Sequence, residues 1–198
     1  MDSTAVEKAK DRLRRAKESL AQISVPGQQK FERLADHWST FLIALNGVYA
    51  ALEQGAKSSP QSRQWFGMKK NERRKDPLLQ YLHQARNADE HGIAPVTKMT
   101  PLNVRHLSGD PLTELIVEED RLRIGVGKDQ TATVRVYVPT FILTTVSDTR
   151  CGDSFESPTH HMGKPVEHTK SPPSVGALAL AYAEALVLEA EAIAKKTS

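Results

Sequence analysis

Apolar residues recur at helical spacing in two long segments at the start of the chain. Within residues 4–24 they follow one another at steps of three and four, as one face of a helix requires: Val6, Ala9, Leu13, Ala16, Leu20 and Ile23. The same spacing continues for about six turns from Phe31 to Leu52, with Gly55 as the expected helix end. We therefore expect an amphipathic helix and a central core helix, separated at Pro26 and Gly27.

Start and stop signals predict two more helices before residue 95. Ser59 followed by Pro60 is typical of a helix start, and a short helix carrying Trp65, Phe66 and Met68 is expected there. Asp76 and Pro77 begin the next helix in the same way. It is expected to run to about residue 91, because Gly92 and Pro95 stop it.

The period of the pattern changes to two between about residues 102 and 147. In "TATVRVYV" the valines alternate with Thr133, Arg135 and Tyr137, which predicts antiparallel strands. Residues 148–173 are rich in Pro, Gly, Ser, Thr and His and are expected to form a loop. Ser171 and Pro172 then begin a long Ala- and Leu-rich helix.

These elements predict a mainly α single domain over residues 1–198. The expected fold is an up-down four-helix bundle with a small antiparallel β-sheet inserted before the last helix, because an Ala/Leu-rich helix needs other helices to pack on. The bundle would comprise residues 4–92 and 172–197, and the β-rich insertion would cover about residues 102–170.

Composition narrows the classes of function only a little. The apolar fraction of 39% and the charged fraction of 26% are ordinary for a globular protein, and a net charge of +3 permits a nucleic-acid ligand without arguing for one. A lone cysteine, Cys151, excludes an internal disulfide and favours a reducing compartment. We expect no secretory signal and no membrane span, because no long apolar run is present, and hence a cytoplasmic location.

The helix that ends near residue 91 concentrates polar chemistry in its last turn. On a helical wheel, Asn87 and His91 are four residues apart and share the face opposite the apolar stripe, with Arg86 on the flank. Asp89 projects near the apolar stripe if the helix is still regular there, so either it has a polar partner or the helix has begun to unwind.

These side chains are suited to cleavage of a phosphodiester without a metal. The imidazole of His91 can exchange protons near neutral pH, and Asn87 can fix which ring nitrogen points outward. Arg86 can grip a phosphate through two parallel hydrogen bonds. A proton carrier, an orienting amide and a phosphate ligand are the parts that such a reaction needs.

The stretch "RNADEH" resembles the signature of the HEPN superfamily, an Arg followed by a polar residue and then by a His four to six residues after the Arg. Arg86, Asn87 and His91 occupy these places. The resemblance implies a four-helix bundle that dimerises with its two motifs facing each other. It also implies a metal-independent endoribonuclease, often a toxin or defence effector, that leaves cyclic-phosphate ends. His91 would then be the acid or base, Arg86 the phosphate ligand and Asn87 a supporting residue.

Two other clusters are candidates for binding. Trp65 precedes the cations Lys69, Lys70, Arg73, Arg74 and Lys75, and cations beside aromatics suit a nucleic-acid strand. The alternative is a solvated helix face, with Trp65 and Phe66 in the core. The loop residues Cys151, Asp153, His160, His161 and His168 match no compact metal motif, so we expect neither a metal nor a cofactor.

The sequence thus favours a HEPN-type endoribonuclease that cuts RNA at a homodimer interface. The alternative is a catalytically inactive HEPN-like module that binds nucleotide, RNA or a protein partner such as an antitoxin. A small-molecule enzyme that uses the His-rich loop is a third, less favoured class. The strand-rich stretch is the departure from the resemblance, since the minimal bundle has no such element.

Overall fold

The protein is mainly helical, with small antiparallel sheets. A computed structural model describes residues 1–25, 30–92, 94–109, 114–117, 122–125, 131–147 and 152–197. Its helices are α1 (Ser3–Ile23), α2 (Phe31–Ala56), α3 (Pro60–Lys75), α4 (Pro77–His91) and α5 (Pro172–Thr197). The predicted break at Pro26 and Gly27 lies outside the described residues.

Capping side chains set the predicted helix starts. The hydroxyl of Ser59 accepts a hydrogen bond from the Ser62 amide at the start of α3. The carboxylate of Asp76 accepts one from the Leu79 amide at the start of α4. Both helices have Pro at the first position, where the missing N–H is not needed. The predicted starts at Pro60, Pro77 and Pro172 are confirmed.

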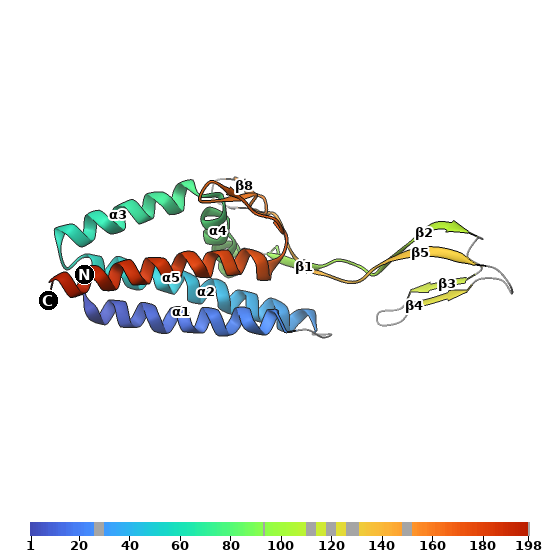
Figure 1. Cartoon of the computed structure of the whole chain (residues 1–198), viewed down its shortest axis with the longest axis horizontal. Coiled ribbons are helices and arrows are strands. Elements are labelled where there is room, and N and C mark those ends of the chain that lie inside the picture. The colour runs from blue at the N-terminus through green and yellow to red at the C-terminus, as the bar shows by residue number, and fades with distance from the viewer. Residues whose placement is uncertain are drawn as a thin grey trace. The chain divides into compact units, whose positions relative to one another are not determined.

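Helices α1, α2 and α5 lie side by side and enclose much of the core (Figure 1). Trp38 and Phe41 of α2 are fully buried, and their rings stack with centroids 5.0 Å apart. Gly55 was expected to end α2, but the helix continues to Ala56. A Cβ at Gly55 would lie 2.5 Å from the Cβ of Ala5, so glycine is needed here for close packing of α1 on α2.

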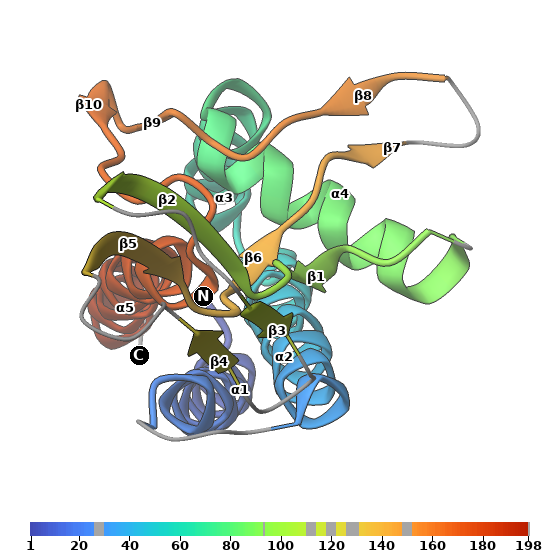
Figure 2. The same cartoon turned by 90° about the vertical axis from the view of Figure 1, so that its right-hand side faces the viewer.

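Helix α4 runs across the other helices. Figure 2 shows α4 along its length, whereas α1, α2 and α5 are seen nearly end-on. The direction changes at Asp76, which alone separates α3 from α4 and has extended backbone. Helix α4 is held by its buried apolar residues and by Tyr81, whose hydroxyl donates to the Thr144 carbonyl at 2.7 Å.

The strands form short two-stranded ladders. Most of them lie within the predicted region of about residues 102–147, but one precedes it and three lie within residues 148–173, which we expected to form a loop. Their bounds are β1 (Thr97–Met99), β2 (Asn103–Gly109), β3 (Glu114–Val117), β4 (Leu122–Gly125), β5 (Ala132–Tyr137), β6 (Phe141–Leu143), β7 (Val146–Ser147), β8 (Ser154–Phe155), β9 (His160–His161) and β10 (Lys164–Pro165). Antiparallel pairs join β2 to β5, β3 to β4, β7 to β8 and β9 to β10, and β1 lies next to β6.

The chain divides into two compact units. Unit 1 comprises Met1–Lys98 and Leu143–Ser198 and contains all five described helices, whereas unit 2 comprises Met99–Ile142. We expected the β-rich insertion to extend to about residue 170. Residues 143–170 instead belong with the helices. The Tyr81 hydroxyl of α4 donates to the Thr144 carbonyl, and the Met162 amide donates to the carboxylate of Asp76 at the start of α4.

None of the helices in the described ranges is long and apolar enough to cross a lipid bilayer.

Candidate functional site

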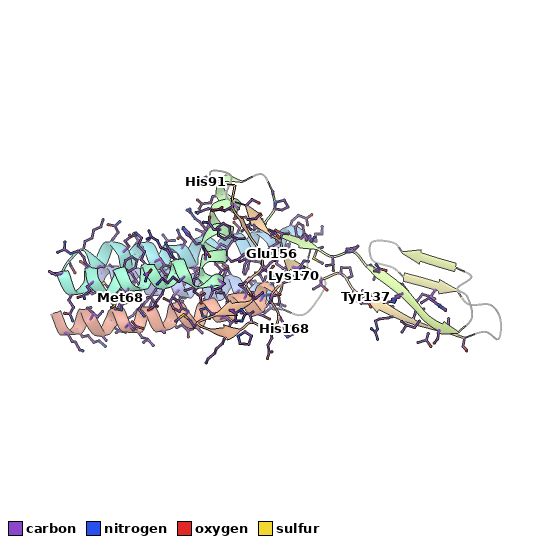
Figure 3. All side chains as sticks on the ribbon, turned by 90° about the horizontal axis from the view of Figure 1, so that it is seen from above. Met68, His91, Tyr137, Glu156, His168 and Lys170 are labelled. Carbon is purple, nitrogen blue, oxygen red and sulfur yellow. The ribbon has the colours of Figure 1, made fainter. Side chains whose placement is uncertain are left out.

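The last turn of α4 presents the Arg-Asn-His motif at the surface of unit 1. Five buried residues anchor the preceding turns of the helix: Leu78, Leu79, Tyr81, Leu82 and Ala85. The amide of Gly92 donates to the Ala88 carbonyl at 2.7 Å, and the helix ends there as predicted. Figure 3 shows the labelled His91 at this end of α4. Its side chain is 72% exposed, so a ligand can reach the imidazole from solvent.

Glu90 lies between Arg86 and His91 of the motif. Its Oε2 atom is 2.6 Å from Nη2 of Arg86 and 3.7 Å from Nε2 of His91. The Arg86 and Glu90 side chains are only 25% and 28% exposed, so this ion pair is less screened than a pair on the open surface. The structure thus brings Arg86, Glu90 and His91 together as one cluster.

Asn87 contacts Arg86 rather than His91. Its Oδ1 atom accepts a hydrogen bond from Nη1 of Arg86 at 3.3 Å, and its Nδ2 atom donates to Oε1 of Gln84 at 3.5 Å. We expected Asn87 to orient the imidazole, but in this conformation the residue beside the His91 ring is Glu90. The amide of Asn87 therefore steadies the guanidinium.

Arg86 also has one donor that is not used. Its Nε atom is buried and has no hydrogen-bond partner within the described part of the chain. The Nη atoms are paired with Glu90 and Asn87, as above. A buried donor without a partner is costly, which is a reason for the side chain to rearrange when an anion approaches.

Asp89 has the polar partner that its position requires. The hydroxyl of Ser39 on α2 donates to Oδ2 of Asp89 at 2.5 Å, and this bond fixes the last turn of α4 against α2. Ile43 is one helical turn beyond Ser39 on α2 and is 45% exposed. An exposed apolar side chain therefore lies on the α2 face that meets the end of α4.

The basic run lies within α3 rather than after a short helix, and most of its cations have partners. Lys69 pairs with Glu72 and Glu189, and Lys70 pairs with Glu53 at 2.9 Å. The guanidinium of Arg73 lies 4.7 Å from the centroid of the Tyr49 ring. Arg74 and Lys75 are exposed.

Trp65 is in the core. It is 7% exposed, as is Phe66, and its Nε1 atom donates to Oε2 of Glu189 at 2.8 Å. Its ring is therefore covered by other parts of the protein. We had expected Trp65 to stack on a base, and the ring is not available for that. Of the proposed substrate-binding set, Arg74 is the member whose charge is most open to solvent, since Lys69, Lys70 and Arg73 are engaged within the protein.

The His-rich segment supplies a structural contact to the start of α4. Nδ1 of His161 lies 3.0 Å from Oδ1 of Asp76, and the Met162 amide donates to Oδ2 of Asp76. Among the residues that the structure describes, no group of three or more His, Cys, Asp or Glu side chains is placed to hold a metal ion. Cys151 lies outside the described residues.

Glu90 is the site residue that sequence reasoning missed. The signal was present, because a Glu four residues after an Arg on a helix is placed to pair with it. Comparison of the chain with protein-family models, with curated proteins and with solved structures finds no match.

Proposed function

We propose that the protein is a metal-independent endoribonuclease of the HEPN type, in which Arg86 and His91 act on RNA at the interface of a homodimer. The observation that carries the proposal is the end of α4, where an exposed imidazole lies beside the partly buried Arg86–Glu90 pair. The four-helix bundle of that superfamily is part of the same proposal.

The proposed reaction needs only proton transfer and charge neutralisation. The ribose 2′-oxygen attacks the phosphorus, a new P–O2′ bond forms and the P–O5′ bond breaks, which leaves a 2′,3′-cyclic phosphate and a 5′-hydroxyl. His91 takes the proton from the 2′-hydroxyl or delivers one to the leaving oxygen. Arg86 neutralises the charge that develops on the non-bridging phosphate oxygens.

A second copy of the chain would complete the site. The reaction uses one group as base and one as acid, and each chain offers a single exposed histidine at this helix end. Ile43, 45% exposed on the adjoining face of α2, is an apolar contact that a symmetric partner could cover.

Cleavage of RNA in excess EDTA is the direct test. We expect wild-type protein to cut single-stranded RNA and to leave cyclic-phosphate ends, and His91→Ala and Arg86→Ala each to lower the rate by at least about a hundredfold. His168→Ala is the matched control, since it removes another exposed histidine far along the sequence. Equal unfolding midpoints would show that the fold is intact. Cutting that survives both motif changes, or that requires added metal, would contradict the proposal.

Glu90 is expected to compete with the substrate phosphate for Arg86. Glu90→Gln removes the negative charge and keeps the shape of the side chain. We expect RNA to bind about fivefold more tightly, which corresponds to about 1 kcal/mol of relieved repulsion. The measurement is fluorescence anisotropy of labelled RNA on a His91→Ala background, which prevents cutting.

Glu18→Gln provides the control for net charge. Glu18 pairs with Arg14 at 2.7 Å in the same four-residue spacing on α1, and its side chain is 60% exposed. This change should leave RNA affinity as it is. Weaker binding by Glu90→Gln would mean that Glu90 positions Arg86 for the substrate instead of competing with it.

The second candidate is an inactive HEPN-like module that binds RNA, nucleotide or a protein. The observation that favours it is the Arg86–Glu90 pair itself, because Nη2 of Arg86 already binds a carboxylate at 2.6 Å and a phosphate would have to displace it. On this alternative, RNA would bind equally well to wild type and to both motif variants, and no cleavage would be detected.

A further inference from the structure

The ribbon formed by β2 and β5 has two chemically different faces. In an antiparallel pair, residues directly opposite each other project from the same side. Val104 is opposite Val136, and these valines lie on one face. The other face carries two directly opposed pairs, Asn103 with Tyr137 and Arg105 with Arg135.

Arg105 and Arg135 place two positive charges next to each other. Both side chains are exposed, and like charges directly opposite each other destabilise a strand pair. Segments 97–109 and 131–147 contain neither Asp nor Glu. Within the described ranges, neither guanidinium has an ion-pair partner. An anion bound between the two arginines would relieve the repulsion.

Tyr137 adds an aromatic surface to the same face. It lies two residues after Arg135, is 44% exposed, and is labelled on the ribbon in Figure 3. Leu107, 46% exposed, adds apolar surface close to the irregularity in the β2–β5 register. Paired cations beside an exposed aromatic ring are suited to a single strand, whose phosphates meet the cations and whose bases stack on the ring.

We propose that the β2–β5 ribbon binds single-stranded RNA, with Arg105 and Arg135 on the phosphates and Tyr137 stacked on a base. The choice of RNA rests on the proposed function. The arginine pair and the tyrosine are features of unit 2 alone and do not depend on the Arg86–His91 motif.

The test is RNA binding by the full-length His91→Ala protein in EDTA, with a fluorescently labelled single-stranded, uridine-rich RNA as the probe. This background removes cutting from the readout. If wild type fails to cut but binding depends on Arg105 and Arg135, the proposed nuclease activity is wrong and the ribbon proposal stands. If wild type cuts RNA but binding does not depend on Arg105 and Arg135, the ribbon proposal is wrong and the nuclease proposal stands.

Arg105→Gln with Arg135→Gln is the informative double variant. We expect affinity to fall at least about tenfold and the slope of log K against log salt to become shallower by about 1.4, since each phosphate contact to a single strand contributes about 0.7. Loss of ribbon pairing would not explain this result, because removing opposed like charges favours strand pairing. Arg105→Lys with Arg135→Lys should restore most of the affinity and the slope.

The matched control is Arg33→Gln with Arg63→Gln, which removes two exposed charges from α2 and α3. Its affinity should stay within about twofold of the parent. An equal loss in both double variants would show that only net charge matters, and an unchanged slope in the ribbon variant would overturn the proposal.

Tyr137→Leu separates stacking from charge. We expect about tenfold weaker binding of single-stranded RNA and no change for duplex RNA, whose bases are already stacked. An equal effect on both would exclude stacking. A polyglutamate peptide that binds the ribbon as tightly as RNA at the same salt concentration would overturn the proposal in favour of an acidic protein partner.

Discussion

The buried carboxylate of Asp76 links the start of α4 to the segment that carries β9 and β10. It is 7% exposed, and it accepts hydrogen bonds from the Leu79 amide at the start of α4 and from the Met162 amide between β9 and β10. His161 adds a third contact at 3.0 Å. Burial alone would raise the pKa of Asp76, but these hydrogen bonds from Met162, His161 and Leu79 outweigh it and hold the pKa below its ordinary value.

The lowered pKa predicts how stability depends on pH. A carboxyl whose pKa is lower in the folded state stabilises the protein fully above its unfolded pKa, which is about 4. This stabilisation is lost as the pH falls through the folded pKa. We expect Asp76→Asn to lower the free energy of unfolding by about 2 kcal/mol at pH 7. Below about pH 4 the difference from wild type should shrink, because this carboxyl takes up a proton in the unfolded chain before it does so in the folded chain.

Urea unfolding of both proteins between pH 3 and pH 7 measures this difference. Asp2→Asn is the matched control, because Asp2 caps α1 through the Ala5 amide on the exposed surface and Asn caps as well as Asp. A difference between wild type and Asp76→Asn that is the same at pH 3 and pH 7 would contradict this account.

At the residue scale, the sequence predicted which side chains need a polar partner more easily than it predicted which residues those partners are. The need of Asp89 for a partner followed from its place beside the apolar stripe, but nothing in the sequence identified Ser39, fifty residues earlier, as that partner. Trp65 was uncertain because an aromatic beside cations suits both a core and a binding surface. Its bond to Glu189 on α5 depends on tertiary packing.

At the element scale, the close approach of α1 to α2 depends on Gly55. A Cβ there would lie 2.5 Å from the Cβ of Ala5, which has no rotamer by which to move away. We expect Gly55→Ala to destabilise the protein by roughly 1–3 kcal/mol through overpacking.

Gly67 offers a matched control in α3. A Cβ at this exposed helical position meets nothing within 4 Å, so Gly67→Ala should stabilise the protein by roughly 0.5–1 kcal/mol through helix propensity. Both changes can be measured as shifts in the urea midpoint. If both changes stabilise the protein, helix propensity rather than close packing determines the effect of Gly55→Ala on stability.

Helix boundaries were predicted well where a side chain defines them. The starts at Pro60, Pro77 and Pro172 carry a local signal, whereas the length of α3 does not, and its basic last turns were therefore placed outside the helix. The direction of α4 across its neighbours is also not local. It depends on the extended backbone of Asp76 and on contacts made with residues far along the chain, such as Thr144.

At the scale of the whole molecule, the chain enters and leaves the greater part of unit 2 at two residues that lie side by side, Thr100 and Thr140. The Thr100 amide donates to the Thr140 carbonyl at 2.9 Å, and the Thr140 amide donates to Oγ1 of Thr100 at 2.8 Å. A two-residue turn could therefore replace residues 101–139 without stretching the chain.

We expect unit 1 to fold when Asn-Gly replaces residues 101–139. The contacts of Leu143 and Thr144 within unit 1 are retained, so Tm should change by about 4 °C or less. Calorimetry and far-UV circular dichroism measure the outcome. Loss of the helical signal would show that the helices depend on unit 2 to fold.

The division into two units explains which parts of the site could be predicted. The Arg-Asn-His motif is local, so its place at a helix end followed from the sequence. The expected insertion ran on to residue 170 because composition marks residues 148–173 only as a loop. The strand pairs and the Asp76 contacts that tie residues 143–170 to the helices join positions distant in the sequence.

The contacts of Asp76 have a consequence for local unfolding. The Leu79 amide at the start of α4 and the Met162 amide between β9 and β10 are eighty-three positions apart, yet both donate to this one carboxylate. Neither segment can detach without withdrawing a partner from the other. The two amides should therefore lose protection against hydrogen exchange in a single cooperative opening. The first turn of α4, the helix that carries the motif, should then be as rigid as the β9–β10 hairpin.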